Sequence, residues 1–312
     1  MKEQDPRLAI AIQKSSGGGN GRLTNDSIDL LKGCDFKFRV TDRLDSTQVT
    51  NYPMDILSLR SRDIPRLLGR GLVDLGIVGL DILVESEIPL VRLMPLGYGR
   101  CKLALGVRED VEYREPSDLK DATVATSYPN ITNGFFKARE VPIDLLYLEG
   151  SAELAGFRKW ARGVIDVIES GSSMLTNGLD PKEVLFESEA WLVASPSLRG
   201  KNGSGEIVEE FLTRSLALLR PRLNRLIVVN VPAGTENAVK DLIPGSLSPT
   251  VSPCVDPGWL DISSVVPAND FWEITKKLKA LGARDIIELE MKRMLPNGED
   301  PDIAQIMAKI YA

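Results

Sequence analysis

Short apolar segments that alternate with helix-like segments constrain the fold of this chain more than any other feature. Leu8–Ile12 is wholly apolar, as expected of a strand buried on both faces of a parallel sheet. Met54–Leu59 and Val73–Val78 are predicted as further strands, and a helix between them begins at Asp63-Ile64-Pro65. Strands that alternate with helices predict an α/β fold with a mostly parallel sheet.

The same pattern restarts after a predicted strand at Lys102–Val107. Further strands are predicted at Thr123–Thr126, Leu145–Tyr147 and Val164–Ile168. We therefore expect two α/β lobes, the first over residues 1–104 with 190–222 returning to it, and the second over 105–189. A ligand cleft is expected between two lobes joined in this way.

Residues 223–312 differ from the rest of the chain. The predicted elements follow the order strand, helix, strand, strand, helix, strand, from Arg225–Val231 to Asp285–Met291. This order is typical of a ferredoxin-like split unit. The sequence leaves open whether the unit senses a ligand or mediates oligomerisation.

The composition restricts the chemistry. The chain has no histidine, which excludes Ser-His and Cys-His nucleophilic pairs and histidine metal ligands. Its net charge of −6 argues against nucleic-acid and membrane-surface partners. Cys34, Cys101 and Cys254 are far apart, so reduced thiols are expected rather than a zinc site. The charged N-terminus and the lack of a long apolar run predict a cytoplasmic protein.

The segment Val164–Ser173 is the strongest local candidate for a functional site. An apolar strand containing Asp166 leads through Glu169 into the small-residue loop Ser170-Gly171-Ser172-Ser173. Such a loop can direct backbone N–H groups and hydroxyls toward one anion. The carboxylates could accept hydrogen bonds from sugar hydroxyls or position Mg²⁺, so a phosphorylated ribose would fit. An ordinary Ser-Gly turn is the alternative.

Other candidates lie near predicted strand ends. Gly17–Gly21 lacks the ending of a Walker motif, but Lys14 and Arg22 flank it where open α/β sheets bind ligands. These cations could meet phosphates or simply be solvated. Asp81 follows a glycine-containing strand, and Tyr128 could stack on a ring or be an exposed loop residue.

An ordered set of motifs carries a family resemblance. The motifs are Gln13-Lys14-Ser15, Gly21-Arg22-Leu23, Asp55-Ile56-Leu57, Asp63-Ile64-Pro65, Val73 through Gly79, Gly99 through Leu103, Ala125 through Pro129, Gly150 through Glu153 and Asp166 through Ser173. Together they resemble the ATP phosphoribosyltransferase family of histidine biosynthesis. Pro249-Thr250-Val251 and Phe271 through Ala283 resemble the regulatory domain of its long form.

The resemblance implies a two-lobed, periplasmic-binding-protein-like catalytic part, a ferredoxin-like regulatory domain and condensation of ATP with phosphoribosyl pyrophosphate (PRPP). Adenine N1 would attack the ribose anomeric carbon, and Mg²⁺-pyrophosphate would leave. It implies catalytic roles for Asp166 and Glu153, and PRPP binding by Asp166, Ser170, Gly171, Ser172 and Ser173. It implies ATP binding by Lys14, Arg22, Asp74, Asp81, Cys101 and Tyr128. Thr250 would bind an inhibitor, histidine and AMP would inhibit, and the chain would form a homo-oligomer, a dimer or hexamer.

Four features depart from the family pattern. Ser16–Asn20 extends the first loop, Arg162 replaces a usual aspartate, Ser170 and Ser173 replace threonines, and the connection from Glu85 to Met94 is short. Two alternatives therefore stay open. One is a two-lobed binding or sensor protein, and the other is a regulatory paralogue with altered catalysis.

Overall fold

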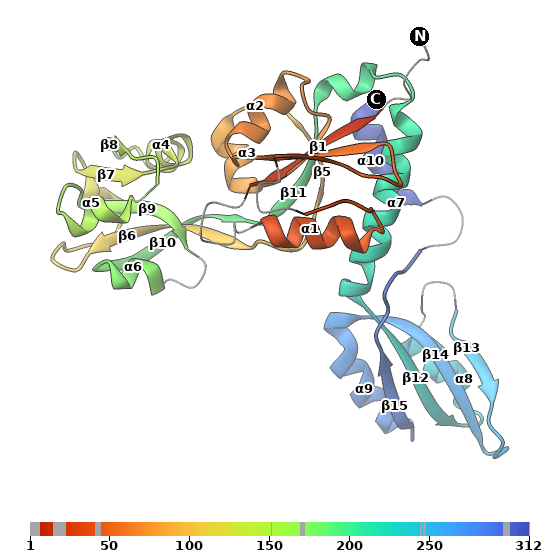
Figure 1. The fold of residues 1–312 in the computed structure, drawn as a ribbon. Coiled ribbons are helices and arrows are strands. Elements are labelled where there is room, and N and C mark those ends of the chain that lie inside the picture. The colour runs from red at the N-terminus through yellow and green to blue at the C-terminus, as the bar shows by residue number, and fades with distance from the viewer. Residues whose placement is uncertain are drawn as a thin grey trace, which may run out of the picture. The chain divides into compact units, whose positions relative to one another are not determined.

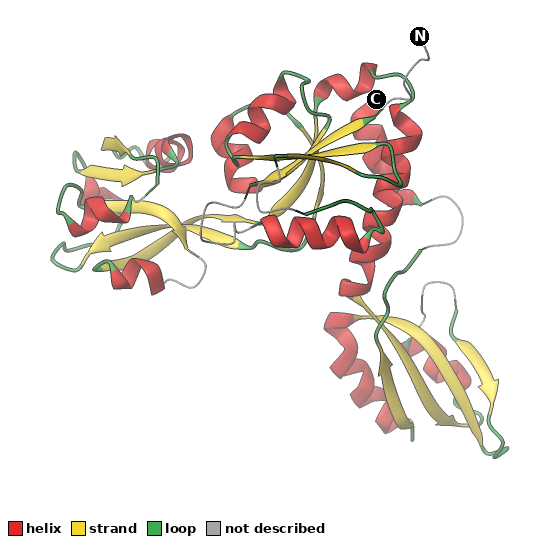
Figure 2. Cartoon of the chain, viewed as in Figure 1, coloured by secondary structure: helices red, strands yellow, loops and turns green. Residues whose placement is uncertain are grey.

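The computed structural model describes residues 7–14, 23–40, 45–150, 152–168, 172–243, 245, 248–295 and 300–311. The chain forms two compact units. The first contains Met1–Lys32, Phe36–Gly205 and Ile306–Ala312, and the second contains Gly33–Asp35 and Glu206–Gln305. Figures 1 and 2 show their helices and strands.

The first unit contains a six-stranded sheet with the order β2-β3-β1-β4-β11-β5. Strand β1 is parallel to β3 and β4, whereas β11 is antiparallel to β4 and β5. The strands are β1 (Leu8–Gln13), β2 (Ser46–Gln48), β3 (Met54–Leu59), β4 (Leu75–Gly79), β5 (Val91–Pro95) and β11 (Ala190–Ala194). Helices α1 (Thr24–Gly33), α2 (Asp63–Gly69) and α3 (Leu80–Ser86) follow β1, β3 and β4.

A second, five-stranded sheet of the same unit has the order β10-β6-β9-β7-β8. Strand β7 is parallel to β8 and β9, and β6 is antiparallel to β9 and β10. The strands are β6 (Cys101–Arg108), β7 (Thr123–Thr126), β8 (Asp144–Tyr147), β9 (Gly163–Ile168) and β10 (Leu179–Ser188). Its helices are η1 (Pro116–Leu119), α4 (Pro129–Lys137), α5 (Glu153–Phe157) and α6 (Ser172–Thr176).

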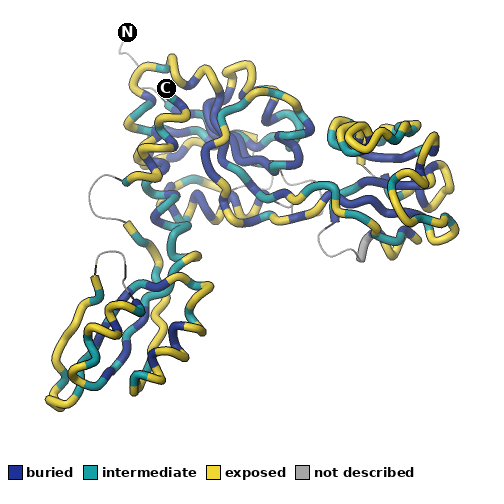
Figure 3. The backbone as a smooth tube through the Cα atoms, turned by 180° about the vertical axis from the view of Figure 1, so that it is seen from behind, coloured by how far each residue is buried: buried dark blue, intermediate teal, exposed yellow. Residues whose placement is uncertain are grey.

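The two sheets of the first unit share a buried apolar core. One cluster joins Val78 and Ile82, at β4 and α3, to Leu105, Val124 and Phe136 of the second lobe. Figure 3 shows the buried residues following the central strands. The predicted two-lobed α/β architecture is confirmed. The predicted lobe boundary at residue 104 falls within β6.

The second unit contains a four-stranded antiparallel sheet with the order β13-β14-β12-β15. Its elements are α7 (Ser204–Leu223), β12 (Asn224–Pro232), α8 (Glu236–Leu242), β13 (Thr250–Pro253), β14 (Trp259–Pro267), η3 (Ala268–Asp270), α9 (Phe271–Ala280) and β15 (Arg284–Leu289). The core joins residues of β12 and β14 to residues of α8 and α9. This confirms the ferredoxin-like domain.

Several elements differ from the sequence expectations. Helix α5 is short and ends at Phe157, because Lys159 has a left-handed φ of 60°. Strands β5 and β10, helix α3 and helix α10 (Pro301–Tyr311) were not predicted. The short helix η2 (Pro196–Gly200) follows β11. No helix in the described part of the chain is long and apolar enough to cross a membrane.

Candidate active site

Asp166 and Glu153 form a carboxyl pair in the second lobe. Asp166 lies on β9 between Val164 and Ile168, whose side chains belong to a small apolar cluster. Its Oδ1 accepts a hydrogen bond of 2.8 Å from the backbone N–H of Val167. Burial raises the pKa of Asp166 to about 6, although the Val167 N–H opposes the rise, and the neighbouring Glu153 carboxyl raises the pKa further. Glu153 and Asp166, the two residues to which the resemblance assigns catalytic roles, are therefore neighbours in the structure.

The predicted phosphate loop follows β9 directly. Glu169, Ser170 and Gly171 lie outside the described residues, as do Arg22 and the insertion Ser16–Asn20. Ser172 and Ser173 begin helix α6. Because β9 is parallel to β7, the carboxyl end of β9 and Tyr128, which follows β7, lie at the same edge of the sheet.

Arg162 lies at the other end of β9. It is exposed, its backbone N–H donates to Thr123 O at 2.9 Å, and its charge contributes to the lowered pKa of Asp118. The main cause of that lowering is the two backbone N–H groups of Arg114 and Glu115. Asp166 lies four positions after Arg162 along an extended strand, about 13 Å at 3.3 Å per residue. The departure at Arg162 is therefore remote from the carboxyl pair.

Asp81 and Tyr128 connect the two lobes. Asp81, in the first turn of α3, is 1% exposed. Its Oδ2 accepts from the Tyr128 hydroxyl at 2.9 Å, and its Oδ1 accepts from the Ser188 hydroxyl at 2.6 Å. The Arg62 guanidinium lies 5.3 Å from the centre of the Tyr128 ring. Tyr128 is thus a buried, hydrogen-bonded residue rather than an exposed loop tyrosine.

Cys101 lies beside this group. It is a buried free cysteine at the start of β6, and it pairs in register with Ser188 of β10. Together with Leu80 and Trp191, both residues line a pocket of about 410 Å³. Arg100 and Lys102 form ion pairs with Glu189 and Glu187 at its rim, at 3.8 and 3.1 Å. The predicted ATP residues Asp81, Cys101 and Tyr128 therefore lie close together.

Lys14 and Asp74 lie at opposite edges of the first sheet. Lys14 follows β1 at its carboxyl end, where its Nζ forms an ion pair with Asp45. Asp74 precedes β4 at the amino end, where its Oδ2 accepts from the Ala9 N–H and from Lys201 Nζ, both at 2.7 Å. The structure does not bring Asp74 to the edge that carries Asp81, because its carboxylate tethers the amino ends of two strands.

Three residues near the lobe junction were missed by the sequence reasoning. Arg62 donates to Ser127 O, Ser188 contacts Asp81, and Glu85 accepts from the first turn of α4. The spacing of Asp81 and Glu85, one helical turn apart on α3, could have indicated Glu85. Ser188 ends a strand that the sequence did not predict.

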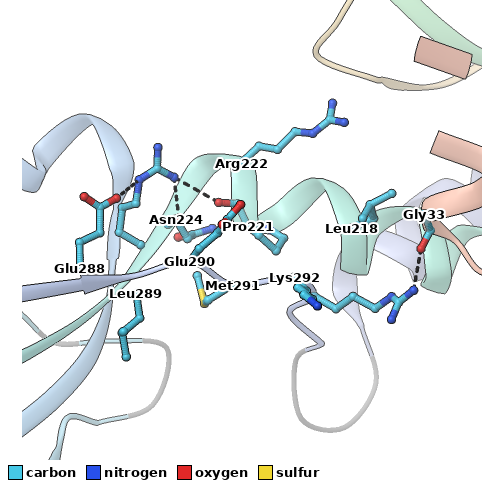
Figure 4. Close-up of a pocket in the computed structure, with 12 residues that line it drawn as sticks. Gly33, Leu218, Pro221, Arg222, Asn224, Glu288, Leu289, Glu290, Met291 and Lys292 are labelled. Atoms are coloured by element: carbon cyan, nitrogen blue, oxygen red, sulfur yellow. Dashed lines mark hydrogen bonds and ion pairs between the residues drawn. The ribbon is translucent and has the colours of Figure 1, made fainter. Parts of the chain in front are cut away.

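The second unit contains two further pockets. Figure 4 shows one of about 750 Å³, where the end of α7, the start of β12 and the segment after β15 meet. There Arg225 pairs with Glu288 at 2.6 Å, and Arg293 donates to Gly33 O at 2.7 Å. The other, of about 320 Å³, lies near Ile243 and Val266. Thr250, the predicted inhibitor residue, is exposed on β13 and lines neither pocket.

Comparisons with known proteins agree with this architecture. The family model for ATP phosphoribosyltransferase (HisG) matches residues 60–215, and the model for the HisG C-terminal domain matches residues 222–293. The ATP phosphoribosyltransferase of Cytophaga hutchinsonii is 35% identical over 288 residues, which cover 92% of this chain and 98% of that protein. The enzyme of that name from Bacteroides fragilis is 34% identical over 288 residues, covering 92% and 99%.

A solved structure shows the same fold. A chain of the ATP phosphoribosyl transferase (HisG:HisZ) complex from Thermotoga maritima superimposes with a TM-score of 0.56 at 22% identity, covering 67% of this chain and 98% of that one. The two matching family models and the curated relatives that span nearly the whole chain show that it belongs to the ATP phosphoribosyltransferase family, in the form that carries the C-terminal domain.

Proposed function

We propose that this chain condenses ATP with PRPP to give phosphoribosyl-ATP and pyrophosphate, the first step of histidine biosynthesis. Adenine N1 forms the new bond to the ribose anomeric carbon while the bond to pyrophosphate breaks. Family membership supports the reaction, and the half-buried Asp166–Glu153 pair before the loop is the observation that supports the site.

The chemistry fits the residues available. A neutral ring nitrogen is the nucleophile, so catalysis needs alignment and stabilisation of the leaving group rather than a strong base. We assign Asp166 and Glu153 to the ribose hydroxyls of PRPP, and Ser170, Gly171, Ser172 and Ser173 to its 5-phosphate. Burial favours protonation of Asp166, so the pair can share a proton and both donate and accept hydrogen bonds.

The proposed ATP site is formed by Lys14, Arg22, Asp81, Cys101 and Tyr128. Asp81 and Tyr128 are fixed by their mutual hydrogen bond, and Cys101 lines the adjacent pocket. Asp74 is left out of this site because of its bonds to Ala9 and Lys201.

Mg²⁺ is proposed as the cofactor. Among the described residues, no group of three or more Cys, Asp or Glu side chains could hold a metal ion by itself. Mg²⁺ is commonly bound by one or two carboxylates together with substrate phosphates. The Asp166–Glu153 pair fits that donor set, and the ion would neutralise charge on the leaving pyrophosphate.

Pyrophosphate release from ATP, PRPP and Mg²⁺ tests the proposal. We expect release that requires all three components and falls at least a hundredfold in Asp166→Ala. The matched control Asp29→Ala changes an exposed carboxylate on α1 and should retain activity. If wild-type protein releases no pyrophosphate without histidine, yet a small ligand raises its melting temperature, a binding or sensor role would replace this proposal.

We also propose that histidine inhibits through residues 223–312, with Thr250 near the bound inhibitor, and that AMP inhibits competitively with ATP. The chain would act as a homo-oligomer. Replacing residues 224–289 by a flexible linker should abolish histidine inhibition and leave pyrophosphate release. This excision retains α10, whose Ile306 and Ile310 are buried in the first unit. Inhibition that persists in this variant would contradict the assignment.

A further inference from the structure

Helix α3 contacts the start of α4 through two acidic side chains. Asp81 and Glu85 are one turn apart on α3, and they are 1% and 6% exposed. Asp81 accepts from the hydroxyl of Tyr128, the residue that precedes α4. Glu85 contacts the next residues along the chain. The two carboxylates therefore hold one continuous segment, Tyr128 to Ile131.

Glu85 binds the first turn of α4 with both oxygens. Its Oε1 accepts from the Asn130 N–H and its Oε2 from the Ile131 N–H, each at 3.0 Å. The Asn130 side chain returns a hydrogen bond of 2.8 Å to the backbone oxygen of Glu85. First-turn N–H groups have no partner within their own helix, and the N-cap residue Tyr128 provides no side-chain cap. Glu85 supplies that cap from the other lobe.

The charge of Glu85 suits this position. A carboxylate is favoured at a helix N-terminus by the helix dipole, and hydrogen bonds to an ionised acceptor are stronger than neutral ones. Arg62 also reaches the junction, where it donates to Ser127 O and lies against the Tyr128 ring. The position of Tyr128 is thus determined from both sides, by Arg62 and by the α4 turn that Glu85 binds.

We propose that Glu85 is a positioning residue for the ATP side of the reaction, acting through Tyr128. This inference rests on the proposed function, because it takes Asp81 and Tyr128 as part of the ATP site. Glu85 itself faces the helix turn and would touch neither substrate. Losing its two hydrogen bonds would free the first turn of α4 and misalign Tyr128, while the Asp166–Glu153 pair on β9 and α5 would be unaffected.

Kinetics of Glu85→Ala and Glu85→Gln test the proposal, with ATP and PRPP varied separately. We expect Glu85→Ala to raise KM for ATP about tenfold and to leave KM for PRPP within about twofold. Glu85→Gln keeps one acceptor oxygen and should raise KM for ATP about threefold. The control Glu87→Gln, an exposed residue after α3, should match wild type. Unchanged KM values, or equal changes for both substrates, would overturn the proposal.

A second measurement does not depend on catalysis. The melting temperatures of Glu85→Gln, Tyr128→Phe and the double variant form a cycle. Non-additive shifts would support coupling between Glu85 and Tyr128, and additive shifts would overturn it. Hydrogen exchange at Asn130 and Ile131 should accelerate in Glu85→Ala. If wild type releases no pyrophosphate, the proposed reaction fails, but the cycle and the exchange rates still decide the role of Glu85.

Discussion

Asp166→Asn should make the protein more stable at neutral pH while it impairs PRPP use. Burial raises the pKa of Asp166 to about 6 from a usual value of 3.8. The folded chain therefore holds this proton more tightly than the unfolded chain. The stability provided by the protonated group is complete below about pH 4 and is lost as the pH rises through about 6.

The size of the effect follows from the shift. One pKa unit corresponds to about 1.4 kcal/mol, so ionising Asp166 costs on the order of 2 kcal/mol once partial exposure and the shared proton are allowed for. Asparagine cannot ionise, and its Oδ1 can still accept from the Val167 N–H. Above pH 7, the variant should melt roughly 4–8 °C higher than wild type, and the difference should vanish near pH 4.

Thermal unfolding between pH 4 and 8 provides the assay, with Asp29→Asn as an exposed control on α1. Asparagine cannot reproduce the shared proton, so we expect kcat/KM for PRPP to fall by at least tenfold in Asp166→Asn. A variant that melts below wild type at pH 8, or a stability difference that does not change with pH, would refute the reasoning. Unchanged PRPP kinetics would show that the charge on Asp166 affects stability but not PRPP use.

Two further changes test assignments made from the structure. Lys201→Met removes the ammonium group that pairs with buried Asp74 at 2.7 Å. This change should lower the free energy of unfolding by about 2 kcal/mol and leave KM for ATP and KM for PRPP unchanged. A selective rise in KM for ATP would instead indicate that Asp74 belongs to the ATP site. Arg162→Asp restores the usual family residue at an exposed position far from Asp166, so turnover should stay within about twofold. A large rise would favour the view that the chain is a paralogue altered at this residue.

The sequence predicted the central strands well because burial on both faces leaves little ambiguity. Met54–Leu59 and Thr123–Thr126 have the predicted bounds. Strand β10 was missed because Pro181 and two register shifts interrupt its pairing with β6, so its extended form depends on the partner strand. Local pattern does not contain that information.

Helix α10 was missed although its pattern was present. Ile303, Ile306 and Ile310 have helical spacing and are buried. Pro301 occupies the first turn, and Asp300 Oδ1 accepts from the Asp302 N–H at 3.1 Å, as in a capped helix start. Residues 223–312 were expected to form one domain, but the end of α10, from Ile306, belongs to the first unit.

The candidate site was predictable only as a set of motifs. A motif identifies a strand and its flanks, but it does not say at which end of the strand a side chain acts. Asp74 and Asp81 belong to one motif region, yet they lie at opposite ends of β4. The contact between α3 and α4 joins residues about 45 positions apart and was therefore invisible in the local pattern.

The surroundings of four carboxylates in the first unit separate structural roles from functional ones. Asp74 forms an ion pair with Lys201, and Glu85 accepts hydrogen bonds from two N–H groups of α4. Asp81 accepts hydrogen bonds from the hydroxyls of Tyr128 and Ser188. Asp166 has the Val167 N–H and, beside it, a second acid, Glu153. Glu153 raises the pKa of Asp166 through a hydrogen bond and through its charge, whereas Glu87 raises the pKa of Glu85 through its charge alone. A half-buried acid kept beside another acid costs stability, and such a cost is tolerated where substrate binding relieves it. That reasoning supports the proposed role of Asp166 in PRPP binding, whereas the bonds of Asp74 and Glu85 support structural roles for those two carboxylates.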